Sequence, residues 1–140
     1  MLKFIEFFGN YSCEAVQFIA ILCLLYSIPI YLIIFIYAVG LMLNVALNKC
    51  LKKMINPYMP SGHFQSIFYS LTFVFLIFYY TQKKLFYKFW KFPSFISSIL
   101  IIFCLHNCIK YHYHSLLQIF IGSLIGIVMG WLTFSAFLYL

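Results

Sequence analysis

The chain has 140 residues, of which 66% are hydrophobic and only 8% are charged. Soluble domains are roughly 45–50% apolar and about a quarter charged, so this composition excludes an ordinary soluble protein and predicts an integral membrane protein. The net charge of +7 comes from lysines that lie between hydrophobic stretches, where positive charge sets membrane topology. We therefore expect no nucleic-acid binding. The five cysteines contain no CxxC pair, which indicates neither a disulfide framework nor a zinc site.

Long apolar stretches predict an all-α fold, a polytopic transmembrane bundle of about five spans in a single domain over residues 1–140. The uncharged run 15–47 is too long for one ordinary span, and Pro29 lies inside it. We interpret this run as a tight helical hairpin, with a single long kinked span as the alternative. The N-terminal stretch lacks the clean hydrophobic core of a cleavable signal peptide, so the first span is expected to act as the targeting signal. The expected spans are about 8–26, 28–48, 62–81, 94–110 and 114–139.

Topology places two polar segments on the same side of the bilayer. One is the loop that ends in Pro-Ser-Gly-His, and the other is the junction 106–115 before the last span. Two crossings separate them, so they can meet in space. The lysine-rich loop 83–91 lies on the opposite side and is expected to face the cytoplasm, which directs the polar segments to the lumen or the outside.

Ser61, Gly62 and His63 open an apolar run, and therefore a helix. Unpaired amides and the helix dipole at a helix N-terminus favour an anion such as phosphate, and a glycine lets the ligand approach the backbone. The alternative is an ordinary N-cap serine followed by an interfacial histidine.

A second polar element is the segment "KYHYHSLLQIFIG". His114 and Gln118 are four residues apart, which predicts that they share one helix face, with Lys110 one turn earlier. A glutamine oxygen there can fix the imidazole tautomer, and a fixed neutral imidazole is a nucleophile toward phosphorus. The alternative is a His/Tyr/Lys cluster at the membrane boundary.

Two further patterns have a structural explanation, and one of them has a functional explanation as well. Gly122, Gly126 and Gly130 recur every four residues, and this stripe of small residues predicts close packing of the last span against its neighbours. Lysines close the second span; they can bind an anion or can snorkel to the interface as anchors. These lysines are Lys49, Lys52 and Lys53.

The order of these elements along the chain resembles the type 2 phosphatidic acid phosphatase (PAP2) superfamily and, within it, the dolichyl diphosphate phosphatases. The resemblance covers about residues 43–137 and is carried by "LNVALNKCLKKMINP", "YMPSGHFQSIFYSLTFVFLIFYY" and "YHYHSLLQIFIGSLIGIVMGW". The glutamine at 118 supports the subfamily, since most of the superfamily has aspartate there. The resemblance implies a helical core of the PAP2/chloroperoxidase type.

The resemblance also implies roles. His114 would attack the terminal phosphorus and form a phosphohistidine, Gln118 would orient it, and His63 would protonate the leaving group and later help to activate water. The other expected residues would hold phosphate oxygens, and no metal or cofactor is implied. These phosphate-binding residues are Ser61, Gly62, Lys52, Lys49, Lys53 and Lys110.

Two positions depart from the family pattern. Asn56 and Cys108 stand where the family has arginine, which grips phosphate bidentately. Losing one such donor typically costs about 10²–10³ in rate, and Lys53 and Lys110 are the residues expected to compensate.

The sequence thus predicts a membrane lipid phosphatase that converts polyprenyl (dolichyl) diphosphate to the monophosphate and phosphate. It would act in the endoplasmic reticulum with a lumenal site and recycle the carrier lipid for N-glycosylation. The alternatives are a phosphatase for another lipid phosphate, a catalytically degenerate relative that binds lipid phosphate or acts as a membrane scaffold, and a small pore-forming or structural protein.

Overall fold

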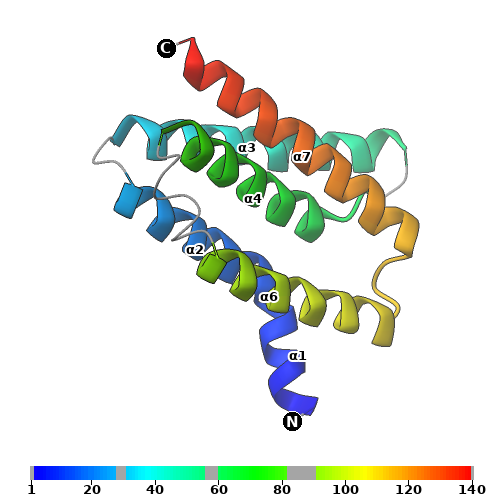
Figure 1. Ribbon diagram of the computed structural model, residues 1–140. Coiled ribbons are helices and arrows are strands. Elements are labelled where there is room, and N and C mark those ends of the chain that lie inside the picture. Colours follow the sequence, from blue (N-terminus) through cyan, green and yellow to red (C-terminus); the bar gives the residue numbers. More distant parts are fainter. Residues whose placement is uncertain (1, 28–30, 56–59, 82–90, 140) are drawn as a thin grey trace.

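The computed structural model describes residues 2–27, 31–55, 60–81 and 91–139, and every element in these parts is a helix (Figure 1). Four of the helices are long and apolar enough to cross a membrane, and a bent pair at the N-terminus gives a fifth candidate span. The expected all-α membrane bundle of about five spans is therefore confirmed. The described helices are α1 (Leu2–Asn10), α2 (Ser12–Ser27), α3 (Tyr31–Met54), α4 (Gly62–Thr81), α6 (Lys91–Lys110) and α7 (Leu116–Leu138).

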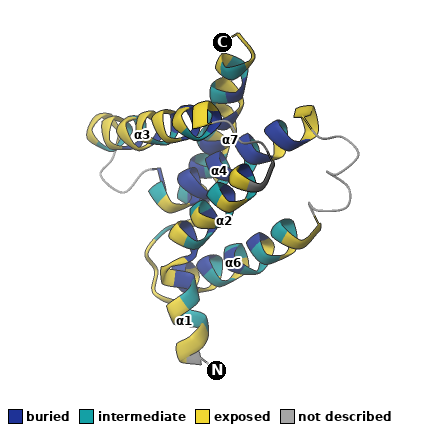
Figure 2. Ribbon diagram, turned by 90° about the vertical axis from the view of Figure 1, so that its left-hand side faces the viewer, coloured by how far each residue is buried: buried dark blue, intermediate teal, exposed yellow. Residues whose placement is uncertain are grey.

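Helix α4 is the centre of the bundle. It contacts α2, α3 and α7, and 56% of its apolar window is buried, against 22–33% for the other three long helices. Figure 2 shows the same distribution, with buried residues gathered on α4 and exposed residues along the outer face of α3. The exposed side chains of the outer helices are mostly large and apolar, as a lipid-facing surface requires.

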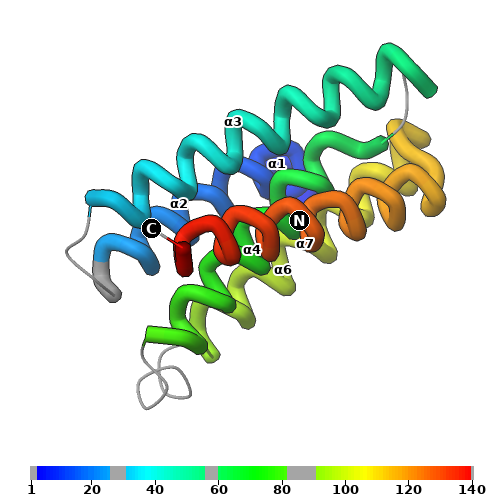
Figure 3. The backbone as a smooth tube through the Cα atoms, turned by 90° about the horizontal axis from the view of Figure 1, so that it is seen from above, coloured from blue at the N-terminus to red at the C-terminus, as the bar shows by residue number. Residues whose placement is uncertain are grey.

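The first expected span, 8–26, differs from the structure because the chain bends by 60° between α1 and α2. At the bend, the hydroxyl of Ser12 donates to the carbonyl of Gly9 at 2.9 Å. Gly9 lies directly against Asn107 and the backbone of Phe103, so α1 packs on α6 instead of continuing the axis of α2. Seen from above, the long helices run side by side (Figure 3).

The Pro29 turn lies outside the described residues. On either side of it, α2 and α3 are separate helices that contact one another. The lysine-rich loop also lies outside the described residues, except for the exposed Lys91 at the start of α6.

The glycine stripe of α7 packs against the backbone of α4, as the sequence predicts. A Cβ on Gly122 would lie 2.5 Å from the carbonyl oxygen of Ser61, and one on Gly130 would lie 2.8 Å from the carbonyl oxygen of Tyr69. Only glycine permits this approach, and the α4–α7 contact is the most extensive helix contact in the described parts. The stripe therefore fixes the start of α7 beside the start of α4.

Candidate functional site

One end of the bundle gathers the polar residues, at the right in Figure 1, where α3 and α6 end and α4 and α7 begin. A cleft of about 380 Å³ opens there. His63 from the first turn of α4 and His114 from the α6–α7 connection both line it, so the two polar segments of the sequence do meet. The lining residues are Cys13, Glu14, Val45, Asn48, Lys49, Lys52, Gly62, His63, Ser66 and His114.

Helix periodicity decides which lysines reach the cleft. Lys49 and Lys52 share the face of α3 that carries Val45 and Asn48, and both line the cleft. Lys53 is exposed and is not among the lining residues. Lys110, at the end of α6, forms an ion pair with Glu6 of α1 and is also outside the lining. The structure thus brings two of the four candidate lysines to the site.

Ser61 and Gly62 occupy the N-terminus of α4, as expected. The amide of Ser61 donates to the backbone carbonyl of Gln118 at 3.2 Å, which joins the starts of α4 and α7. The Ser61 hydroxyl is fully buried and has no hydrogen-bond partner in the described part of the chain. Gly62 lines the cleft, and a Cβ there would approach the Asn48 side-chain oxygen to 3.2 Å.

His114 does not lie on a helix, which corrects the expectation that it shares a helix face with Gln118 and Lys110. Helix α7 begins at Leu116 with Ser115 as its N-cap. The Ser115 hydroxyl accepts from the Gln118 amide at 3.3 Å, and the Gln118 side-chain oxygen accepts from the Ser115 amide at 2.7 Å. The Gln118 oxygen thus accepts from the Ser115 amide, and the Gln118 side chain also stays close enough to His114 to interact with the imidazole.

Burial lowers the pKa of His114 from its ordinary value of about 6.5, because the charged ring is poorly solvated. A side-chain hydrogen bond with Gln118 raises the pKa of His114, whereas the electrostatic effects of His63 and Lys52 lower it. The ring is therefore neutral at physiological pH, and its Nδ1 atom is buried without a hydrogen-bond partner among the described residues.

A second, smaller chamber of about 130 Å³ adjoins the same two histidines. Cys108, which stands where the resemblance expects an arginine, is buried and lines this chamber. Asn56, the other such position, lies outside the described residues. The lining of the chamber consists of Gly9, Asn10, His63, Cys104, Asn107, Cys108, Tyr113 and His114.

A buried polar network lies next to the cleft, between the end of α3 and the start of α4. The Gln65 amide donates to the backbone and side-chain oxygens of Asn44, both at 2.9 Å, and its own oxygen accepts from Asn48 at 2.7 Å. Asn48 also donates to the carbonyl of Pro60 at 3.3 Å. Polar side chains inside a membrane helix are costly unless paired, so the network clamps the end of α3 to the start of α4.

Sequence reasoning missed the contributions of α1, α2 and the last turns of α6. Cys13 and Glu14 line the cleft, and Asn10 and Asn107 line the chamber. The only available signal was their polarity within apolar stretches. In the described parts, no group of three or more His, Cys, Asp or Glu side chains is arranged to hold a metal ion.

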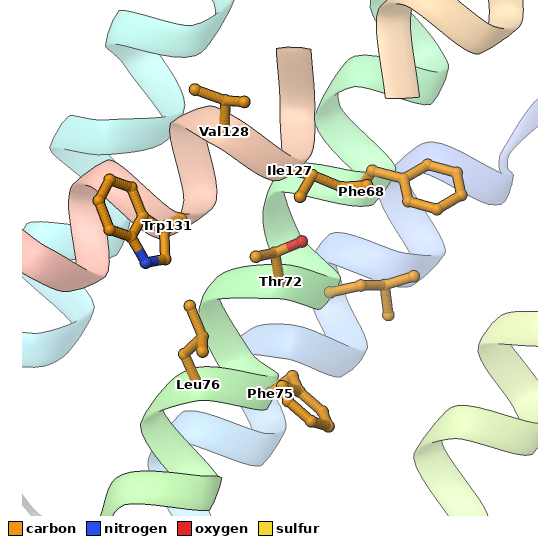
Figure 4. A pocket seen from close by; sticks show the side chains of 8 residues that line it. Phe68, Thr72, Phe75, Leu76, Ile127, Val128 and Trp131 are labelled. Carbon is orange, nitrogen blue, oxygen red and sulfur yellow. The ribbon is translucent and has the colours of Figure 1, made fainter. Parts of the chain in front are cut away.

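An apolar groove of about 540 Å³ lies apart from the histidines, between α4 and α7 (Figure 4). It is lined by Phe68, Leu71, Thr72, Phe75, Leu76, Ile127, Val128 and Trp131. None of these side chains titrates near neutral pH, so the groove offers no group for phosphate chemistry.

The fold and the cleft define an integral membrane protein with a histidine pair and lysines at one end of a helical bundle. The chain belongs to the PAP2 superfamily, whose family model matches residues 7–140. It is a membrane phosphatase-like protein of a family whose substrates are generally lipid phosphates. Comparison with curated proteins and with solved structures gives no match.

Proposed function

We propose that this chain, as a single domain over residues 1–140, hydrolyses a polyprenyl diphosphate, dolichyl diphosphate in particular, to the monophosphate and phosphate. The observation that supports this most directly is the convergence of His63, His114, Lys49 and Lys52 on one cleft. A neutral imidazole, a second imidazole and two ammonium groups are the parts that phosphoryl transfer through a histidine needs.

In the first step, His114 is the nucleophile. Its Nδ1 atom is buried, so Nε2 is the nitrogen that attacks the terminal phosphorus. The bond from that phosphorus to the bridging oxygen breaks, and the oxygen takes the electron pair and a proton from His63. The lipid monophosphate leaves, and the phosphoryl group stays on His114.

In the second step, water attacks the phosphohistidine. The P–N bond breaks, its electron pair returns to the His114 ring, and the proton of the water passes to His63. The exposed position of His63 on the first turn of α4 suits both roles, because solvent and the leaving group can reach it. Inorganic phosphate leaves and both histidines regain their starting states.

Phosphate binding in both steps falls to the start of α4 and the end of α3. The Gly62 amide and the α4 dipole would face the phosphate oxygens, while Lys49 and Lys52 supply positive charge. The Ser61 hydroxyl is buried outside the cleft lining, so it would contribute only to a phosphate that approaches the first turn of α4 closely. Lys53 and Lys110 are not needed, since they lie outside the cleft lining.

The choice of dolichyl diphosphate as the substrate, and of the endoplasmic reticulum with a lumenal cleft as the location, rests on the resemblance and on the lysines that the sequence carries between α4 and α6. The substrate would enter sideways from the bilayer, because the cleft lies at the ends of membrane-spanning helices. A carrier lipid recycled in this way serves N-glycosylation.

Phosphate release from dolichyl diphosphate tests this proposal, with purified protein in detergent and EDTA present. Release that disappears in His114→Ala supports a metal-independent histidine phosphatase. Phosphatidic acid, offered in competition, separates a diphosphate-specific enzyme from a phosphatase for another lipid phosphate. Equal release from wild type and His114→Ala would refute the proposed chemistry.

A second candidate function is binding of lipid phosphate without hydrolysis. One observation favours it: Cys108 replaces an expected arginine beside both histidines. A thiol cannot stabilise a transition state as a guanidinium does, whereas Lys49 and Lys52 can still attract phosphate. Binding to dolichyl diphosphate vesicles without release, together with release gained in Cys108→Arg, would support this candidate.

A further inference from the structure

The small chamber beside the histidines contains two buried polar atoms that lack partners. Nδ1 of His114 and Oδ1 of Asn107 are each buried and have no hydrogen-bond partner among the described residues. Both residues line the same chamber of about 130 Å³. A buried polar atom left unpaired costs about 1–3 kcal/mol, so two of them at one cavity call for a common ligand.

The orientation of the Asn107 amide is fixed by its donors. Its nitrogen donates to the carbonyl of Glu6 at 2.9 Å and to the side-chain oxygen of Asn10 at 3.0 Å. A flipped amide would place oxygen against both of these acceptors, so the carbonyl oxygen is the atom left for the chamber. Asn107 is only 3% exposed, so its oxygen has no access to bulk solvent.

The chemistry of this pair selects water as the ligand. An amide oxygen only accepts hydrogen bonds, so it repels a phosphate oxygen and needs a donor. Water is the smallest molecule that accepts from an imidazole N–H and donates to an amide oxygen at once. A water molecule occupies about 30 Å³ in the liquid and needs two to four polar partners. The chamber has room for it, and His114 and Asn107 provide two such partners.

The other groups at the chamber are poorer acceptors. The Asn10 oxygen already accepts from Asn107. The Tyr113 ring is exposed and stacks on Tyr111 at 5.5 Å, and the Cys108 thiol is a weak hydrogen-bonding group. Asn107 is thus the strongest acceptor without a partner among the described residues of the lining.

We propose that a water molecule in the small chamber joins the Nδ1–H of His114 to Oδ1 of Asn107, which makes Asn107 a positioning residue for the nucleophile. The bridge holds the proton on Nδ1 and leaves the lone pair of Nε2 free for phosphorus. Gln118 also interacts with the His114 side chain, and the water bridge acts at Nδ1, the ring atom that has no partner among the described residues. This role rests on the proposed function, since only a nucleophilic His114 requires it.

The test reads the tautomer directly, without substrate. Protein with ¹⁵N-labelled histidine is examined by NMR in detergent above neutral pH, and His114→Ala assigns the His114 signals. We expect the Nδ1–H tautomer in wild type and a shift toward Nε2–H in Asn107→Leu. Asn107→Asp keeps an acceptor and should keep the wild-type tautomer.

A matched control separates positioning from packing. Asn10→Ala removes a partner of Asn107 but leaves its oxygen in place, so it should keep the tautomer. In turnover assays, Asn107→Leu should lower kcat about tenfold with little change in KM. An Nε2–H tautomer in wild type, an unchanged tautomer in Asn107→Leu, or an equal change in Asn10→Ala would overturn the proposal.

If Asn107→Leu fails to fold, Asn107→Ala takes its place, and an Nε2–H tautomer in wild type overturns the proposal without any variant. Failure of the proposed function would give a different result. The His114 tautomer would be Nδ1–H and would depend on Asn107, but the protein would release no phosphate. That result would leave the water bridge standing and remove its catalytic purpose.

Discussion

Replacing Gly122 with alanine tests whether the α4–α7 contact sets the geometry of the histidines. The new Cβ would lie 2.5 Å from the carbonyl oxygen and 3.2 Å from the amide nitrogen of Ser61, whereas ordinary contact begins near 3.4 Å. Both neighbours are backbone atoms, so α7 must retreat from α4 by several tenths of an ångström. The movement opens the hydrogen bond from Ser61 to the Gln118 carbonyl, which is 3.2 Å long.

Two magnitudes follow. Overpacking costs about 1–3 kcal/mol, and the better helix propensity of alanine offsets about 1 kcal/mol of this, so the expected net loss of stability is at most about 2 kcal/mol. Turnover should fall much further, since a displacement of about 1 Å between reacting groups can cost roughly 10²-fold.

Gly130→Ala is the matched control. Its Cβ would meet α4 at 2.8 Å from the Tyr69 carbonyl, a similar clash, but eight residues or about 12 Å further along the helix from the site. Thermal unfolding in detergent and phosphate release are measured for both variants. We expect similar losses of stability and a larger loss of turnover in Gly122→Ala. Equal turnover in the two variants would refute the link between this contact and the site.

Three further predictions concern the cleft. Lys52→Met should raise KM about tenfold, while Lys53→Met should leave it unchanged, as steady-state kinetics will show. Lys52 helps to lower the pKa of His114, so Lys52→Met should raise that pKa. Because the nucleophile must be neutral, the acid limb of the pH–rate profile should then move to higher pH. An acid limb that does not move would contradict the assignment of His114 as the nucleophile. Gln65→Leu removes the partner of the buried Asn44 side-chain oxygen and one of the two hydrogen bonds of Asn48, so thermal unfolding should report a loss of about 1–3 kcal/mol.

The meeting of the two polar segments was predictable because it follows from topology alone. An even number of crossings between Gly62 and His114 puts both at one end, whatever the details of the first span. The glycine stripe was equally predictable, since a repeat of four residues marks one helix face. The number of spans and the four-residue repeat can both be read directly from the sequence.

The prediction that His114 shares a helix face with Gln118 was wrong, and the reason is visible in the sequence. Ser115 and Gln118 are spaced as a capping box, which places the helix start after the histidine. Counting four residues from His114 to Gln118 assumed a helix that had not yet begun. The same error placed Lys110 beside the site, whereas it is paired with Glu6.

The small chamber was not predictable from local patterns. Asn107 and Asn10 are far apart in the chain, and they meet because α1 turns by 60° and packs on α6. Gly9, Asn10 and Ser12 disfavour an unbroken helix near Tyr11, but their types give neither the angle nor the direction of the bend. Tertiary packing of Gly9 against α6 decides it, and such long-range contacts carry no periodic signature.

The hydrogen bond from Ser61 to the Gln118 carbonyl has a consequence for how the protein is made. Helix α4 is synthesised well before α7, so the α4 backbone that the glycine stripe will cover first meets lipid or other helices. The two histidines come together only when α7 inserts and displaces whatever covers that surface. The proposed site is therefore assembled late in biogenesis, and a chain stalled before α7 carries both His63 and His114 but lacks the α4–α7 contact that brings them together.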